Sequence, residues 1–142
     1  MPRRSSHIYR DLVGARPLAE RALAIYETAL SPEHLDTARS LSILASLLQA
    51  LGDLRSARPL FERALAIIER ALGGWHPDTA RALGNLAGLF EGHGDLAGAL
   101  SIYERASAIR EKVLGSDHPD TNRMRAAVLR ARGYVDEGQC PS

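Results

Sequence analysis

A stretch of sequence that returns every 42 residues is the feature that most constrains how this chain can fold. The segment ARPLAERALAI at 15–25 reappears as ARPLFERALAI at 57–67 and as ALSIYERASAI at 99–109. Between residues 15–56 and 57–98, 25 of 42 positions are identical without a gap. Self-similarity at such a period indicates stacked supersecondary units, each of which buries its apolar face only against its neighbours.

Each unit contains two helical patterns separated by helix-breaking residues. In the segment 54–72, Leu54, Ala57, Phe61 and Ala64 recur at three- and four-residue steps, which is one apolar helix face. Glycine followed by aspartate, at 52–53 and 94–95, supplies a left-handed C-terminal cap and an N-cap for the next helix. We therefore expect six helices, at about 15–30, 33–51, 54–72, 77–92, 96–114 and 119–132. Because the connections are short, neighbouring helices should pack antiparallel, in stacked pairs.

The same positions carry the pattern of a known repeat family. The first helix of a unit shows a large residue, then Leu followed by Ala, then a large residue, at Leu41, Leu44, Ala45 and Leu48 and at Leu83, Leu86, Ala87 and Phe90. The second helix shows Ala, an aromatic residue and Ala, at Ala57, Phe61 and Ala64 and at Ala99, Tyr103 and Ala106. A His-Pro-Asp-Thr linker stands at 76–79 and 118–121. The chain resembles tetratricopeptide-repeat proteins, and more narrowly the 42-residue variant found in kinesin light chains and many bacterial proteins. The resemblance implies an all-α, right-handed α-solenoid of stacked antiparallel helix pairs that holds another polypeptide.

We expect three parts along the chain: a flexible N-terminal segment 1–10, a repeat array 11–132 and a C-terminal tail 133–142. The array contains two full repeats, at about 33–72 and 77–114, flanked by half-repeats. The first half-repeat is expected to begin at a turn at Asp11 and Leu12, because residues 1–10 are too few and too polar to form the missing helix. In the third unit Arg125 stands where an apolar residue is expected, and the terminating glycine, Gly133, comes three residues early.

The composition argues against several functional classes. A net charge of +1 gives no bulk attraction for nucleic acid or anionic lipid. The basic first residues lead into no apolar signal segment, and no apolar run approaches the roughly 20 residues of a membrane span. The single cysteine, Cys140, cannot form an internal disulfide. The sequence therefore predicts a cytoplasmic protein that binds neither nucleic acid nor membrane.

Three histidines at the repeat spacing, His34, His76 and His118, suggest a metal site at first sight. Equivalent positions in a solenoid lie roughly 10 Å apart, however, which is too far for the bonds of roughly 2 Å in one zinc site. We expect each histidine to cap or brace its turn, and the following aspartates and threonines to satisfy free amide groups of the first helical turn. His7, His93 and Cys140 form no nucleophile arrangement, and no phosphate-binding loop is present. The chain is therefore predicted to be no enzyme and to hold no cofactor or metal.

Two further patterns leave alternatives open. The Glu-Arg pairs at 20–21, 62–63 and 104–105 are adjacent on a helix, so their side chains do not face each other. They are expected to form solvated surface or to brace neighbouring repeats. Trp75 stands in a turn where the other units have Glu33 and Asp117. It either packs over the joint between helices or offers an exposed contact to a partner.

The resemblance implies that the first helix of each pair lines a concave groove. The predicted groove residues are Arg39, Ser42, Ser46, Gln49, Arg81, Asn85, Gly88, Arg123 and Arg130. One arginine per repeat, Arg39, Arg81 and Arg123, would form a ladder able to bind the carboxylates of an acidic peptide or helix. The alternative is that each arginine pairs with the aspartate three residues before it, at Asp36, Asp78 or Asp120.

A second candidate function is self-association. The helix at 15–30 lacks the preceding helix that would cover its outer face, so Ala15, Leu18, Ala22 and Ile25 are expected to be partly bare. Apolar patches of this kind attract a partner or a second copy of the chain, which would give a homodimer.

Overall fold

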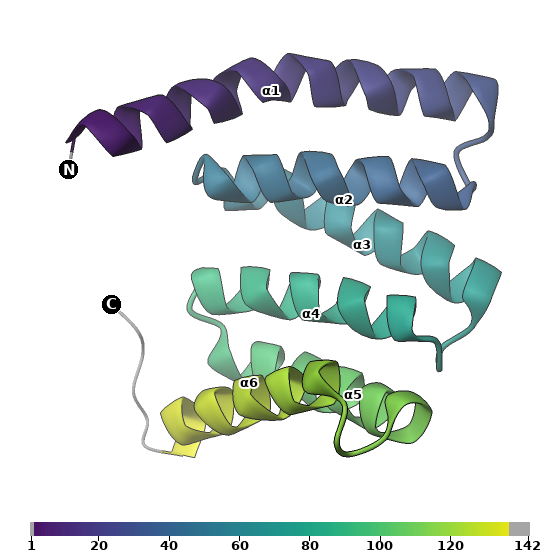
Figure 1. Cartoon of the computed structure of the whole chain (residues 1–142), viewed down its shortest axis with the longest axis vertical. Coiled ribbons are helices and arrows are strands. Elements are labelled where there is room, and N and C mark those ends of the chain that lie inside the picture. The colour runs from purple at the N-terminus through teal and green to yellow at the C-terminus, as the bar shows by residue number, and fades with distance from the viewer. Residues whose placement is uncertain (1, 137–142) are drawn as a thin grey trace. The chain divides into compact units, whose positions relative to one another are not determined.

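The computed structural model describes the backbone of residues 2–136 and the side chains of residues 8–133. The described residues form six helices and no strand: α1 (Pro2–Ala29), α2 (Leu35–Ala50), α3 (Leu54–Leu72), α4 (Pro77–Gly92), α5 (Leu96–Leu114) and α6 (Pro119–Asp136) (Figure 1). The predicted all-α class is confirmed. The contacts divide the chain into two compact units, Met1–Ile67 and Ile68–Ser142, which are described separately. Within residues 2–136, no helix is long and apolar enough to cross a membrane.

In the first unit, α1 and α2 lie side by side and run antiparallel (Figure 1). The buried apolar residues of α2 are those that the helical periodicity predicts, namely Ala38, Leu41, Leu44, Ala45 and Leu48. In the part of α3 that belongs to this unit, Ala57, Phe61, Ala64 and Ile67 are buried. The small alanines allow close helix packing, and Leu41 and Phe61 fill the space between them.

In the second unit, α4, α5 and α6 pack around one apolar cluster. The cluster contains Ala87 of α4, Ala99 and Tyr103 of α5, and Ala127, Val128 and Ala131 of α6. Phe90, Leu100, Ile102 and Met124 pack against it from the edges. Each of the three helices thus contributes side chains to a shared core, and α4 lies against both α5 and α6.

The glycine-aspartate turns have the predicted geometry. Gly52 and Gly94 have φ angles of +86° and +81°, which place them in the left-handed region that glycine adopts without strain. The Asp53 carboxylate accepts the Ser56 N–H at 3.2 Å, and the Asp95 carboxylate accepts the Gly98 N–H at 2.9 Å. The hydrogen bonds from the Ser56 side chain and amide hold the pKa of Asp53 below its usual value. These stops make α3, α4 and α5 coincide with their predicted ranges.

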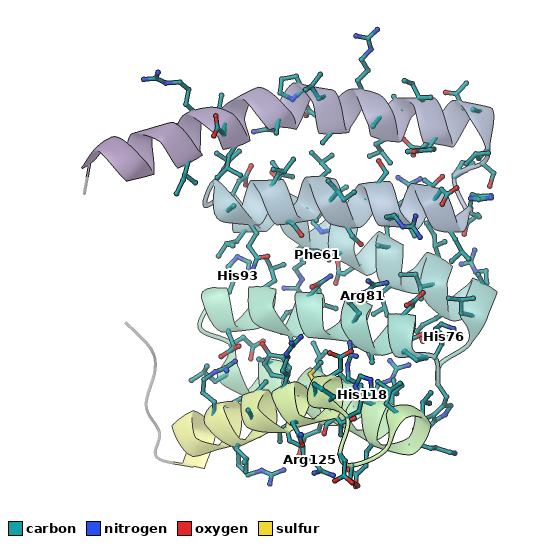
Figure 2. All side chains as sticks on the ribbon, viewed as in Figure 1. Phe61, His76, Arg81, His93, His118 and Arg125 are labelled. Atoms are coloured by element: carbon teal, nitrogen blue, oxygen red, sulfur yellow. The ribbon has the colours of Figure 1, made fainter. Side chains whose placement is uncertain are left out.

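The three histidines cap the helices that follow them. Nδ1 of His34 and of His76 each accepts the N–H of the aspartate two residues later at 3.0 Å, and Nδ1 of His118 does so at 3.1 Å. Figure 2 shows His76 and His118 at the starts of α4 and α6. The expectation that each histidine caps its turn is confirmed. The ring nitrogen replaces the serine or aspartate oxygen that more often accepts an amide at this position.

The threonines of the same turns differ from the expectation. The Oγ1 hydroxyl of Thr37 donates to the Ser31 carbonyl at 2.7 Å, and that of Thr79 donates to the Gly73 carbonyl at 2.6 Å. The Thr121 hydroxyl donates to the carbonyl of Arg110 at 3.2 Å. These fully buried hydroxyls therefore tie each turn to the end of the preceding helix. The prediction that they accept free amides is wrong, because carbonyls left over at a helix end are the groups within their reach.

At its N-terminus the chain departs from the predicted organisation. Helix α1 begins at Pro2 and continues through Asp11 and Leu12 to Ala29, so the predicted turn is absent and residues 2–10 are helical. The reason lies one residue before the expected turn. The other units have Gly52 or Gly94 at that position, whereas here it is Arg10, which favours continuation of a helix.

The C-terminal boundary also shifts. Helix α6 passes through Gly133 and ends at Asp136, so the glycine does not act as the helix stop that its position suggested. A glycine inside a helix costs only about 1 kcal/mol relative to alanine and need not end it. Arg125, which replaces an apolar residue, lies half-buried on α6 and pairs with Glu111 of α5 at 3.2 Å (Figure 2). Cys140 lies outside the described residues.

Ion pairs link the second helices of neighbouring repeats, α1 with α3 and α3 with α5. This agrees with the expectation that the Glu-Arg pairs brace neighbouring repeats. Arg63 Nη2 lies 2.6 Å from Glu27 Oε2, and Arg105 Nη2 lies 3.0 Å from Glu69 Oε2. Both pairs span 36 residues and are one repeat length apart, so they are the same contact in successive repeats. The neighbouring Glu20 and Glu62 instead pair along their own helices with Arg16 and Arg58.

Candidate functional site

In the first unit, the predicted groove residues lie on one accessible face of α2. Arg39 and Ser46 are exposed, and Ser42 and Gln49 are half-buried. The Arg39 guanidinium lies 3.8 Å from the Asp36 carboxylate, and its side chain is 77% exposed. This face is therefore polar and open to solvent, whereas Leu41, Ala45 and Leu48 of the same helix are buried.

In the second unit, α4 and α6 present the equivalent arginines. Arg81 lies 3.0 Å from Asp78, and Arg123 lies 3.4 Å from Asp120. The pairing with the aspartate three residues earlier is thus present in all three repeats. Exposed pairs of this kind contribute only about 0.3–0.5 kcal/mol and are screened by salt. Each guanidinium keeps N–H groups that a ligand carboxylate could engage.

Asn85 lies one helical turn after Arg81 on α4. Its side chain is half-buried, and its amide has no hydrogen-bond partner among the residues whose side chains are described. Among the described side chains, Arg110 Nε is the one fully buried polar atom that lacks a hydrogen-bond partner. The unpartnered amide atoms of Asn85 are therefore accessible to solvent. An accessible amide carries both a donor and an acceptor, which is the pairing that a peptide backbone requires.

Gly88, one turn further along α4, leaves space beside the α5 side chains. A Cβ atom at this position would lie 3.7 Å from the Tyr103 hydroxyl, an ordinary contact distance. The position is half-buried. Arg81, Asn85 and Gly88 therefore place a cation, an unpartnered amide and a bare backbone along one helix.

Arg130 is the predicted site residue whose structural role is most different from the expectation. Its Nη2 lies 2.9 Å from Glu91 Oε1, and its Nε lies 3.4 Å from Glu91 Oε2. The Tyr103 hydroxyl donates to the same carboxylate at 2.6 Å. The Arg130 guanidinium also lies 5.9 Å from the centroid of the Tyr103 ring. Arg130 is thus engaged within the protein.

The electrostatics of this network follow from burial and the shared carboxylate. Burial and the hydrogen bond to Glu91 raise the pKa of the Tyr103 phenol far above its ordinary value. The hydrogen bond to Glu91 likewise raises the pKa of Arg130. Sequence reasoning missed Glu91 and Tyr103 as a pair. The first unit has Gln49 and Phe61 at these positions, so the repeat comparison contains no signal for them.

The predicted self-association patch on α1 is exposed in part. Leu18 is 69% exposed and Ile25 is 57% exposed, whereas Ala15 and Ala22 are half-buried. The residues equivalent to Ile25 in the later second helices, Ile67 and Ile109, are 2% and 1% exposed. Helix α1 therefore leaves open an apolar position that α3 and α5 bury. Ile25 also lines a shallow apolar depression with Arg21, Ala24, Thr28 and Ala29.

The three histidines and Trp75 are the remaining candidates. The Nδ1 atom of each of the three histidines is engaged as a helix cap, and residues 8–133 contain no group of three or more His, Cys, Asp or Glu side chains placed to hold a metal ion. Trp75 is 56% exposed, and the Lys112 ammonium lies 4.6 Å from the ring centroid. The indole is therefore exposed to solvent and also makes a cation–π contact.

The chain shows similarity to known proteins at the level of sequence families and of solved structures. The family model of the tetratricopeptide repeat matches residues 10–69 and 36–112. Three crystal structures illustrate the structural likeness. The first is a Podosopora anserina protein described as a putative kinesin light chain with nearly identical TPR-like repeats, with 29% identity and a TM-score of 0.74 over 95% of this chain. A variant of that protein with one substituted residue gives the same identity and TM-score over 89% of this chain. The third is BtubC (BKLC) from P. vanneervenii, with 26% identity and a TM-score of 0.81 over 93% of this chain.

This chain spans 63%, 59% and 53% of the length of those three structures, respectively. No curated protein matches it. The structural matches are built from stacked repeats of the same kind, so the expected solenoid class is confirmed. Repeats of this kind generally mediate interactions between proteins. Because the family model covers the residues from Arg10 to Lys112, the chain belongs to the tetratricopeptide repeat family.

Proposed function

We propose that this chain is an interaction module that holds an acidic peptide or helix along the exposed faces of its first helices. The observation that carries the proposal is the α4 face in the second unit. There the unpartnered Asn85 amide lies between the exposed Arg81 and the bare backbone at Gly88. The contacting residues are Arg39, Ser42, Ser46 and Gln49 in the first unit, and Arg81, Asn85, Gly88 and Arg123 in the second.

The chemistry of these side chains supports an acidic ligand. Three guanidinium groups with side chains 67–81% exposed carry fixed positive charge and can each grip a carboxylate through two N–H bonds. A ligand carboxylate would compete with Asp36, Asp78 or Asp120 for these bonds, and the exposed pairs are weak enough to yield. Arg130 is bound to Glu91, so in this proposal it forms the end of the α4 face and does not bind the ligand carboxylate.

The test is affinity capture with the full chain, followed by binding measurements on the captured partner. Arg81→Glu reverses the charge on the α4 face and is expected to weaken binding by about tenfold or more. Glu62→Arg is the matched control, since Glu62 is an exposed residue of α3 that pairs with Arg58 on its own helix. Equal loss from the two variants would contradict the proposal.

A second candidate is self-association through α1, and the exposure of Leu18 and Ile25 favours it. Two copies that pair these positions would cover apolar surface that the equivalent residues Ile67 and Ile109 bury. Light scattering at several concentrations would detect the homodimer. Ile25→Glu should dissociate the homodimer, and Leu129→Glu on α6, at 66% exposure, serves as the control. A monomer at every concentration would rule out this second function.

Neither function requires a catalytic residue, cofactor or metal, and the family is typically a non-catalytic one. The cytoplasmic location expected from the composition stays a prediction. Fractionation of cells that express the full-length natural protein would test it.

A further inference from the structure

We infer that Trp75 and Lys112 form a second docking surface, which binds an acidic segment of a partner protein. The segment places a carboxylate on the Lys112 ammonium and an apolar side chain on the Trp75 indole. The two residues lie in the turn between α3 and α4 and in the last turn of α5. Neither belongs to the α4 face of the proposed function, so the inference goes beyond that function and does not depend on it.

The turn between α3 and α4, residues 73–76, holds the indole in place without burying it. The turn begins at Gly73, whose φ angle is +92°, and the Gly73 carbonyl accepts the Thr79 hydroxyl at 2.6 Å. At the other end of the turn, His76 caps α4. Trp75 lies between these two fixed points and is 56% exposed. A large side chain on an ordered turn loses little freedom when a partner covers it, and tryptophan is enriched among the residues that dominate protein interfaces.

The Lys112 ammonium carries a charge that no acid of the protein neutralises directly. It lies 4.6 Å from the centroid of the Trp75 ring. Among the side chains that the structure describes, no carboxylate forms an ion pair with it, and the two glutamates of its own helix, Glu104 and Glu111, pair with arginines of α6. Because Lys112 is exposed, it can take a carboxylate from a ligand without displacing one of the protein's own.

Comparison of the repeats shows what sets this turn apart. One repeat earlier, the positions equivalent to Trp75 and Lys112 carry Glu33 and Arg70, an acid and a base. One repeat later, the turn position carries Asp117. The turn between α3 and α4 has an indole in place of the acid. This replacement takes a carboxylate away from the cation and adds apolar surface beside it, and the resulting surface is complementary to an acid with an apolar neighbour.

A second cation lies next to the same turn. A Cβ at Gly74 would lie 3.6 Å from Arg105 Nη2, so this guanidinium is close to the turn backbone. Arg105 pairs with Glu69 at 3.0 Å, which leaves the charge of Lys112 in excess on this surface. The excess favours an acidic segment over a basic one. Nucleic-acid binding relies on many phosphate contacts, which one unpaired cation does not supply, so the surface fits a protein ligand better.

The experiment uses the fluorescence of the full chain, because Trp75 is its only tryptophan. The probe is an acetylated hexapeptide amide of alternating leucine and glutamate, and the control peptide has glutamine in place of each glutamate. Neither peptide contains an aromatic residue that would add to the signal. We expect the glutamate peptide to change the Trp75 emission saturably and to bind about tenfold more tightly than the glutamine peptide. Added salt should weaken this binding, since it screens exposed charges.

Three protein variants locate the bound peptide. Lys112→Glu should weaken binding of the glutamate peptide by about tenfold or more, whereas Lys112→Arg keeps the charge and should retain most of the binding. Arg55→Glu is the matched control, because Arg55 is an exposed residue of α3 in the first unit and the substitution changes the net charge equally. It should leave binding intact. Circular dichroism of each variant verifies that the helices are retained.

The variant Arg81→Glu separates this surface from the α4 face and should leave the response of Trp75 unchanged. Loss of the response in Arg81→Glu would overturn the inference, because the peptide would then bind the α4 face. So would the absence of a saturable response, equal binding of the two peptides, or unchanged binding to Lys112→Glu. Tighter binding of oligouridylate than of the glutamate peptide would assign the surface to nucleic acid instead. Failure of the proposed function is a separate result, in which Arg81→Glu leaves binding of the captured partner unchanged.

Discussion

The hydroxyl of Tyr103 on α5 donates to the carboxylate of Glu91 on α4 at 2.6 Å. This bond joins the two helices of one repeat at the end where α4 stops. The Glu91 side chain is only 19% exposed, and Arg130 of α6 balances its charge from the other side. One carboxylate thus links all three helices of the second unit.

Tyr103→Phe removes the hydroxyl and keeps the ring. Glu91 then loses one donor in a largely buried place, so we expect the free energy of unfolding to fall by about 1–2 kcal/mol. Urea denaturation followed by circular dichroism measures the change. Tyr26→Phe, at a 39% exposed position in the first unit, should have little effect. An equal effect of the two variants would contradict this role for the Tyr103–Glu91 bond.

The same bond predicts a response to alkaline pH. Burial and Glu91 raise the pKa of Tyr103 above the ordinary 10.0 in the folded chain. The stabilisation from this group is therefore complete below about pH 10 and is lost as the pH rises further, toward the folded-state value. Spectrophotometric titration should show one phenol that ionises later than the others and disappears in Tyr103→Phe. A titration curve that the substitution leaves unchanged in its late phase would argue against the shift.

The helix cap supplied by His76 gives a third prediction. His76→Ala removes the acceptor of the Asp78 amide and should lower the free energy of unfolding by about 1 kcal/mol, while His76→Asn should restore most of it. His93 is the matched control, because this exposed histidine ends α4 through its backbone N–H (Figure 2). If His93→Ala costs as much as His76→Ala, the cap does not explain the loss.

Two glycines should respond to alanine with opposite signs. Gly94 has a φ angle of +81°, so Gly94→Ala introduces backbone strain and should destabilise the chain by about 1 kcal/mol. Gly14 lies inside α1, so Gly14→Ala should stabilise the chain by up to about 1 kcal/mol. A Cβ meets no atom within 4 Å at either position, so packing does not enter the comparison. Thermal unfolding midpoints that shift in the same direction would disprove this explanation.

The sequence predicts helix positions well wherever the repeat contains its own stop signals. Gly52 and Gly94, each followed by aspartate, fix the ends of α2 and α4 and the starts of α3 and α5. Where the signal is absent, the prediction fails in an understandable way. Arg10 replaces the glycine, so α1 runs through the expected turn and begins at Pro2.

The candidate site could be predicted only in part. The accessible face of α4 follows from helical periodicity, because Arg81 and Asn85 lie opposite the buried Leu83 and Leu86. The commitment of Arg130 to Glu91 could not be foreseen, since the two residues are 39 positions apart and neither has a charged equivalent in the first unit.

The central claim, that the chain holds another polypeptide on its first-helix faces, is tested most directly by site-specific photo-crosslinking. A benzoylphenylalanine at Asn85 on α4 is compared with one at Ser101, an exposed residue of α5. The account predicts a crosslink to another protein from position 85, which Arg81→Glu suppresses, and none from position 101. Crosslinks from position 101 alone, or from both positions equally, would contradict the account.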